Sequence, residues 1–132
     1  MSTNTNKTVV SAFYEDLERG DLERGDFSAL SQHFHDDFIF YSQIDTPKPG
    51  VNGFIASEKA FFDECDDWKM PIRHIVAEGD KVAAYLVFEG TYAPTKKLLH
   101  FSLLMLLTLK DGKIIEKRAH FDPLDIGKQV GV

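Results

Sequence analysis

Residues 99–123, "LHFSLLMLLTLKDGKIIEKRAHFDP", have the pattern of two strands joined by a short turn. The turn centres on Asp111-Gly112, and Asp-Gly is a strong signal for a two-residue β-hairpin, because a type I′ turn needs positive φ at both central residues. Such a turn pairs Lys110 with Lys113. The stretch therefore predicts a long antiparallel hairpin whose register can be counted outward from the turn.

The predicted register places charged and apolar side chains on one face of this hairpin. Residues two apart on a strand share a face, and ionisable residues alternate along the second strand: Glu116, Arg118, His120 and Asp122. The register sets them beside an apolar row of the first strand: Phe101, Leu103, Met105 and Leu107. Burying ionisable groups among apolar ones is costly unless they are paired or line a cavity. We therefore predict that the charged row points into a pocket. The alternative is an outward polar face, and a β-bulge in the hairpin would swap the two faces.

Helical patterns occupy the first half of the chain. Apolar residues recur at helical spacing from Thr8 to Glu18, which predicts an amphipathic helix. The pentapeptide "DLERG" then occurs twice, at 16–20 and 21–25. We expect the extra copy to lengthen the connection to a second helix, which Asp26 would cap. A third helix is predicted over about 54–64.

The second half is rich in strands, including "PIRHIVAEG" and "DKVAAYLVFEGTY", separated by turn signals. Helices followed by a run of antiparallel strands indicate an α+β fold. With 132 residues, 43% hydrophobic content and 11 Phe, the chain can bury one substantial core. We predict a single domain over residues 1–132.

Composition argues against several classes of partner. The net charge is −6 and no Lys/Arg cluster is interleaved with aromatic residues, so nucleic acid is not expected as a partner. The longest apolar run, Leu103 to Leu107, is too short to span a bilayer, and "MSTNTNK" lacks the apolar region of a signal peptide. The single cysteine, Cys65, has acidic neighbours and is expected to be unreactive. A soluble, cytoplasmic protein without nucleic-acid or membrane partners is predicted.

Several stretches resemble one family. "AEGDKVAAYLVFEGTY" at 77–92, "KDGKIIE" at 110–116, and the spacing from Glu116 through Asp122 to "QVG" at 129–131 are similar to SnoaL-like polyketide cyclases of the NTF2-like superfamily. The resemblance implies a cone in which three N-terminal helices pack on a strongly curved antiparallel sheet around an internal pocket. The chain departs from the family pattern at Tyr92, where His is common, and at Arg118, where Trp is common.

The resemblance also implies a site. In cyclases of this type a strand-end Asp is the acid/base of an intramolecular aldol closure, and Asp122 occupies that place. Arg118 would offer charge to an enolate, His120 would shuttle a proton or orient Asp122, and Glu116 completes the predicted catalytic row. No cofactor or metal is expected. If the pocket exists, further residues would contact the ligand: Tyr14, Tyr41, Trp68, Leu86, Phe88, Phe101, Leu103 and Met105.

Each of these residues also has a structural interpretation. Asp122 precedes Pro123 and can simply end the strand or form a turn. His120 can be a structural histidine, and Arg118 can form an ion pair with Glu116. The large apolar residues of the ligand set are ordinary candidates for a core.

Three functions are compatible with the sequence. The first is binding of a small hydrophobic carbonyl compound, polyketide-like or steroid-like, with or without cofactor-free cyclase or isomerase chemistry. The second is a non-catalytic module that binds a ligand or dimerises. The third, an epoxide hydrolase, is disfavoured because Ala119 stands where such an enzyme needs an Asp. A homodimer is also predicted, through an outward apolar row: Leu104, Leu106, Ile115 and Phe121.

Overall fold

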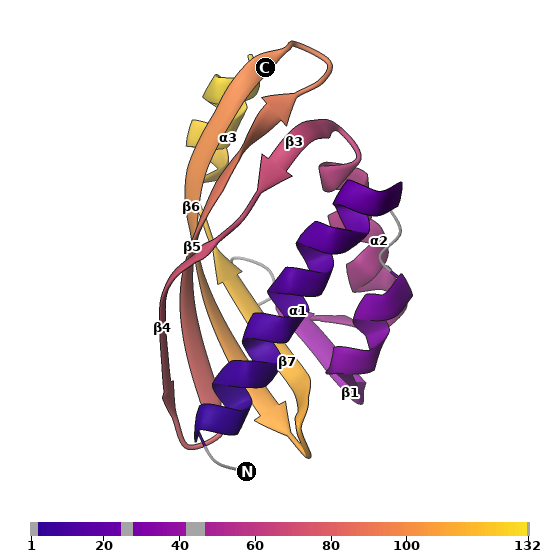
Figure 1. The fold of residues 1–132 in the computed structure, drawn as a ribbon, viewed down its shortest axis with the longest axis vertical. Helices are drawn as coiled ribbons and strands as arrows, with labels where there is room; N and C mark the ends of the chain where they lie inside the picture. Colours follow the sequence, from indigo (N-terminus) through magenta and orange to yellow (C-terminus); the bar gives the residue numbers. More distant parts are fainter. Residues whose placement is uncertain (1–2, 25–27, 42–46, 132) are drawn as a thin grey trace.

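The structure is a computed structural model and describes residues 3–24, 28–41 and 47–131. Its helices are α1 (Thr3–Arg24), the short 3₁₀ helix η1 (Ser28–His33), α2 (Val51–Phe62) and α3 (Pro123–Val130). Its strands are β1 (Phe34–Tyr41), β2 (Pro47–Pro49), β3 (Cys65–Lys69), β4 (Ile72–Glu78), β5 (Lys81–Tyr92), β6 (Lys97–Lys110) and β7 (Lys113–His120). Figure 1 shows α1 and α2 on the same side of a long curved sheet. The predicted α+β fold with an NTF2-like arrangement is confirmed.

Seven strands of the described chain form one sheet in the order β2-β1-β7-β6-β5-β3, and β4 also pairs with β5. The pairing of β1 with β7 is parallel, with Tyr41 beside Arg118. Parallel neighbours need a crossover connection, and here the chain passes through α2 and β3 to β6 before it returns as β7. The prediction of an antiparallel sheet is therefore wrong at this pair, and the sheet is mixed.

Strand β5 is where the sheet changes partners and bends. Its first half pairs with β4, from Lys81 opposite Glu78 to Leu86 opposite Ile72. Its second half pairs with β3, which ends at Lys69 opposite Glu89. The chain passes from β3 to β4 through Met70 and Pro71, and the carbonyl of Pro71 accepts a hydrogen bond from Val87. The two short strands β3 and β4 thus pair with one long strand, and α1 and α2 lie on the concave side of the sheet (Figure 1).

Helix α1 is longer than predicted. Its buried residues recur at helical spacing and face the sheet: Asn6, Val10, Phe13, Tyr14 and Leu17. The helix continues to Arg24, so the prediction that the second "DLERG" lengthens a loop is wrong. Leu, Glu and Arg are good helix formers, which favours continuation of the helix through the second copy. The predicted cap Asp26 lies outside the described residues, and the segment after it is the 3₁₀ helix η1.

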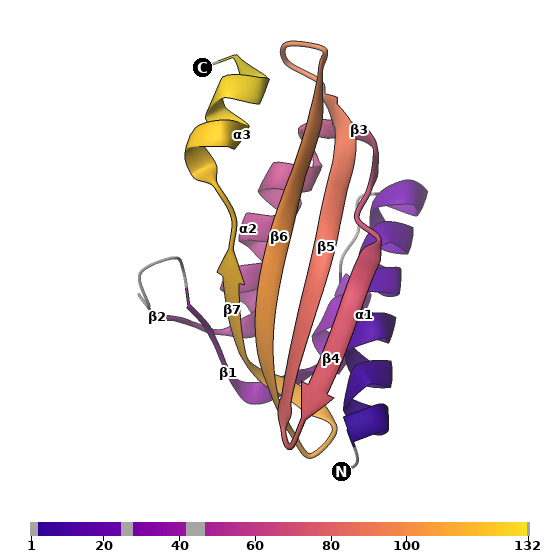
Figure 2. The same ribbon diagram turned by 90° about the vertical axis from the view of Figure 1, so that its left-hand side faces the viewer.

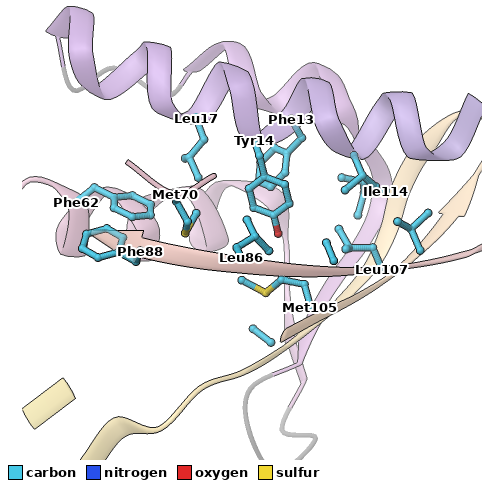
Figure 3. Close-up of a cluster of buried hydrophobic side chains, with 14 of the residues drawn as sticks. Phe13, Tyr14, Leu17, Phe62, Met70, Leu86, Phe88, Met105, Leu107 and Ile114 are labelled. Atoms are coloured by element: carbon cyan, nitrogen blue, oxygen red, sulfur yellow. The ribbon is translucent and has the colours of Figure 1, made fainter. Parts of the chain in front are cut away.

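The core fills the space between α1, α2 and the concave face of the sheet (Figure 3). The ring of Phe62 stacks on Trp68 with 4.2 Å between their centroids, and Trp68 stacks on Phe88 at 5.9 Å. From α1, Phe13 packs edge to face on Phe34 of β1 at 5.2 Å. These aromatic contacts join the helices to both ends of the sheet.

The hairpin begins as predicted and then changes register. Asp111 and Gly112 have φ values of 54° and 76°, and Lys110 lies opposite Lys113, so the predicted type I′ turn is confirmed. After Leu109 opposite Ile114, however, Thr108 lies opposite Glu116. One extra residue, Ile115, is therefore inserted as a β-bulge in β7. Beyond a bulge, every side chain of the strand lies on the other face.

Helix α3 was not predicted from the sequence. The carboxylate of Asp122 accepts hydrogen bonds from the backbone N–H groups of Leu124 at 3.0 Å and Asp125 at 3.2 Å, which caps the helix. Pro123 follows in the first turn, and Gly131 closes the helix with a left-handed φ of 85°. Figure 2 shows α3 beside the end of β6, while the middle of the convex sheet face carries none of the described helices. None of the described helices combines the length and apolar character needed to span a bilayer.

Candidate functional site

A cavity of about 450 Å³ lies between the concave face of the sheet, α2 and α3. Aromatic and aliphatic side chains dominate its lining: Phe40, Phe61, Phe62, Met70, Phe88, Phe101, Leu103, Met105, Ala119, Phe121 and Ile126. The rings of Phe88 and Phe101 stack at 4.9 Å, and Phe61 lies 5.4 Å from Phe88. Phe61 is tilted by 60° against the Phe88 ring, so the three rings form an apolar aromatic wall suited to an aromatic or polycyclic ligand.

Lys117 is the one ionisable side chain among the described residues that line this cavity. It lies on β7 beside Phe40 of β1, and only 1% of its surface is exposed. Its Nζ lies 5.4 Å from the ring centroid of Phe13 and 5.5 Å from that of Tyr14, within cation–π range. Lys117 was not among the predicted site residues. It points to the concave side because of the Ile115 bulge, and the sequence carries no signal that locates the bulge.

The predicted charged row lies on the opposite, convex face, so the prediction that it points into the cavity is wrong. Opposite the row are Thr108, Leu106 and Leu104, and the last two are exposed. Arg118 donates a hydrogen bond to Glu116 and lies over the ring of Tyr41, with 4.0 Å from Cζ to the ring centroid. The alternative interpretation of Arg118 and Glu116 as an ion pair is confirmed.

Asp122 and His120 lie outside the apolar cavity. Both are exposed and line a separate open hollow of about 320 Å³, together with Tyr85, Ser102 and Asp125. Phe101 and Phe121 contribute to both spaces and so stand between them. The observed role of the Asp122 carboxylate is to cap α3, and proton exchange with a ligand remains a prediction for this residue.

The structure divides the predicted ligand set into three groups. Phe88, Phe101, Leu103 and Met105 line the cavity. Tyr14, Trp68 and Leu86 are buried in the core that supports it. Tyr41 lies on the convex side under Arg118, because β1 and β7 are in register there. Among the lining residues that the sequence did not indicate are Phe61 and Phe62 of α2 and Pro123 and Ile126 of α3.

Two further observations concern the hydroxyl of Tyr92 and the capacity to bind a metal ion. Tyr92, at the position where the family commonly has His, does not line the cavity among the described residues. Desolvation, reinforced by the neighbouring Glu64 carboxylate, raises the pKa of the Tyr92 hydroxyl from its ordinary value. Within residues 3–24, 28–41 and 47–131, no three His, Cys, Asp or Glu side chains gather to hold a metal ion.

Comparison with known families agrees with this architecture. The family model described as SnoaL-like polyketide cyclase matches residues 8–130 of this chain. No curated protein matches the sequence.

Similar solved structures come from several bacteria. A SnoaL-like protein from Jannaschia sp. CCS1 is 18% identical, with 98% of this chain and 94% of that chain covered and a TM-score of 0.86. IdmH from Streptomyces antibioticus is 24% identical over 96% and 99% of the two chains, with a TM-score of 0.76. An LEH-like epoxide hydrolase from M. tuberculosis is 20% identical over 97% and 90%, with a TM-score of 0.75. At these identities the likeness shows a shared fold.

Proposed function

Because the chain belongs to the SnoaL-like polyketide cyclase family, we propose that it binds a small hydrophobic carbonyl compound of polyketide-like or steroid-like shape. The observation that carries this proposal is the apolar cavity of about 450 Å³. Ligand sites in proteins typically have about 300–1,000 Å³, mostly apolar walls and a few polar groups. The cavity has this size and this lining, and the polycyclic ligand class fits its stacked aromatic rings.

The position of Asp122 favours binding without acid/base catalysis by this residue. A general acid or base must come within about 2.6–3.2 Å of the proton that it moves. The Asp122 carboxylate is exposed and caps α3. Phe121 stands between it and the cavity. The non-catalytic binding module is therefore the function that the geometry supports best, and cyclase or isomerase chemistry at Asp122 remains a hypothesis. Epoxide hydrolysis has less support, since Ala119 lines the cavity without a carboxylate.

A thermal-shift panel of aromatic and polycyclic ketones tests the proposal. A ligand present at 100 times its Kd raises the free energy of unfolding by about 2.7 kcal/mol, which shifts Tm measurably. Leu103→Trp should abolish the shift by filling the cavity, whereas Leu104→Trp should preserve it. These adjacent residues of β6 face opposite sides of the sheet, so they are a matched pair.

The Leu103→Trp and Leu104→Trp variants also show which results would contradict the proposal. If Leu104→Trp blocked the shift and Leu103→Trp left it intact, ligands would bind on the convex face instead. If no member of the panel stabilised the protein at any concentration, the binding proposal would be wrong.

We also propose that the convex face of the sheet forms a homodimer. Several large apolar residues are exposed there: Val76 at 64%, Tyr85 at 38%, Leu104 at 53%, Leu106 at 42% and Phe121 at 36%. Four of them lie on the neighbouring strands β4, β5 and β6, with Tyr85 opposite Leu104, and Phe121 follows the end of β7. A contiguous apolar patch of this kind is typical of an interaction surface. Ile115, which the sequence placed in this row, is the bulged residue.

A further inference from the structure

Lys117 lies at the buried end of the cavity. Toward α3 the lining residues are open to solvent, as Phe121 and Pro123 show. Toward β7 and β5 they are closed, with Lys117 exposed by 1%, Met105 by 3% and Phe88 by 0%. A ligand that enters beside α3 and fills the cavity would therefore meet Lys117 last, at its inner end.

A lysine at this place is costly for the fold. Removing a cationic group from water is unfavourable, and lysine is among the residue types least often fully buried. Replacing a buried ionic group and its partners by apolar residues is often neutral or stabilising. Groups that cost stability are retained in natural proteins mainly where activity needs them. An apolar wall with one lysine thus has the composition of a recognition site, in which a few polar groups orient the ligand.

We propose that Lys117 is the polar anchor of the cavity and that the ligand carries an anionic oxygen, such as a carboxylate, phenolate or enolate, which the lysine binds. The inference rests on the proposed function and adds the chemical class of the ligand. It needs no free amine: lysine has three N–H donors on a flexible stem, so it can keep contacts with α1 and still donate to an oxygen.

The Ile115 bulge places the Lys117 side chain on the concave face of the sheet. Lys117 lies opposite Leu107, which is buried, and beside Ala119, which also lines the cavity. The small side chain of Ala119 leaves room for a ligand next to the lysine stem. Charge-assisted hydrogen bonds are about twice as strong as neutral ones, and more so where water is excluded.

A series of three naphthalenes of nearly equal shape tests the anchor. 2-Naphthoate presents an anionic carboxylate, 2-acetylnaphthalene a neutral carbonyl, and 2-isopropylnaphthalene carries the same branching without oxygen. With the wild-type protein, isothermal titration calorimetry at neutral pH should give naphthoate the lowest Kd, about 10-fold to 100-fold below that of isopropylnaphthalene. Acetylnaphthalene should lie between them.

Lys117→Met keeps the length and the apolar stem but removes the donors. It should abolish or reverse the preference for naphthoate while leaving the Kd of isopropylnaphthalene within a few-fold. Lys113→Met is the matched control on the same strand, where the side chain is exposed. It should leave all three affinities unchanged, because a solvated charge outside the cavity is screened.

The outcomes separate the two proposals. If no naphthalene binds the wild-type protein, the binding function itself fails. If isopropylnaphthalene binds as tightly as naphthoate, or if Lys117→Met keeps the preference, ligand binding stands and the anchor is wrong. Should Lys117→Met not fold, the order of the three Kd values in the wild type still decides whether the cavity selects an anionic oxygen.

Discussion

Gly90 of β5 has no room for a side chain, because Trp68 of β3 packs directly on its backbone. A Cβ at this position would lie 2.8 Å from the Cβ and 3.2 Å from the Cα of Trp68. Because the second of these is a backbone atom, Gly90→Ala must displace β3. We expect the variant to lose about 1–3 kcal/mol of stability, as overpacked cores do. Urea unfolding, followed by the fluorescence of the single tryptophan, measures the loss.

Gly53→Ala is the matched control for Gly90→Ala. Gly53 lies within α2, and a Cβ there would meet nothing within 4 Å. Since alanine is a better helix former than glycine, this variant should gain about 0.4–1 kcal/mol. Equal effects of the two substitutions would contradict the contact between Gly90 and Trp68.

Substitutions at Asp122 distinguish between its two interpretations, a helix cap and a general acid or base. If it acts as the cap of α3, Asp122→Ala should cost about 0.5–2 kcal/mol, whereas Asp122→Asn should cost only a few tenths because asparagine also caps. Faster amide hydrogen exchange in α3 of the alanine variant would locate the loss. If Asp122 is instead a general acid or base, Asp122→Asn should lower any turnover by about 10²–10⁴ with the cap intact.

At the scale of elements, the bulge in β7 determines which side chains reach the cavity. The Asp111-Gly112 turn was correctly predicted, because a type I′ turn needs positive φ at both central residues and Asp-Gly adopts this conformation readily. The bulge was not predictable from the sequence, because no particular amino-acid type marks an extra residue in a strand. The side chains of β7 beyond Ile115, Lys117 included, were therefore assigned to the wrong face.

Deleting Ile115 tests the role of the bulge. The deletion would give a regular hairpin in which Thr108 still lies opposite Glu116 and Leu107 opposite Lys117, so Glu116 and Arg118 stay on the convex face and Lys117 on the concave face. Because no charge enters the core, the deletion should cost only about 0.5–3 kcal/mol, which circular dichroism during thermal unfolding would measure. One glycine inserted after Thr95, in an exposed turn, is the control and should cost little. A deletion variant that no longer folds would contradict the assignment of Ile115 as the extra residue.

Helix α3 could have been predicted from its local sequence. Asp122 and Pro123 form a capping pair at its start, and Gly131 follows its last turn, as common helix boundaries require. The pattern was interpreted as a strand end because the helix is short, 8 residues, and buries only Val130 among its described side chains. The cavity wall formed by Pro123 and Ile126 was missed for the same reason.

At the scale of the whole molecule, the order of helices and strands was predictable and the arrangement around the cavity was not. Apolar periodicity reports which faces are buried, so it identified the α+β order and residues such as Phe88 and Met105. The parallel pairing of β1 with β7 depends on contacts between residues far apart in sequence, such as Tyr41 and Arg118. Local patterns carry no information about such pairs.

The proposed homodimer leads to a prediction at this scale. Sedimentation equilibrium at micromolar concentration should show a dimer, and Leu104→Glu combined with Leu106→Glu should give a monomer that still folds. Leu98→Glu is the control, because Leu98 is 79% exposed but lies at the end of β6, away from the proposed patch. A wild-type protein that is strictly monomeric would contradict the dimer.

The most direct test of the central claim, that the apolar cavity is the ligand site, uses the methionines. The chain has three, and two of them, Met70 and Met105, line the cavity. In protein labelled with ¹³C at the methionine methyls, 2-acetylnaphthalene should shift both resonances and give nuclear Overhauser contacts from its ring protons to both methyls. Saturating binding with neither methyl affected, and contacts only to convex-face residues such as Leu104, would contradict the account.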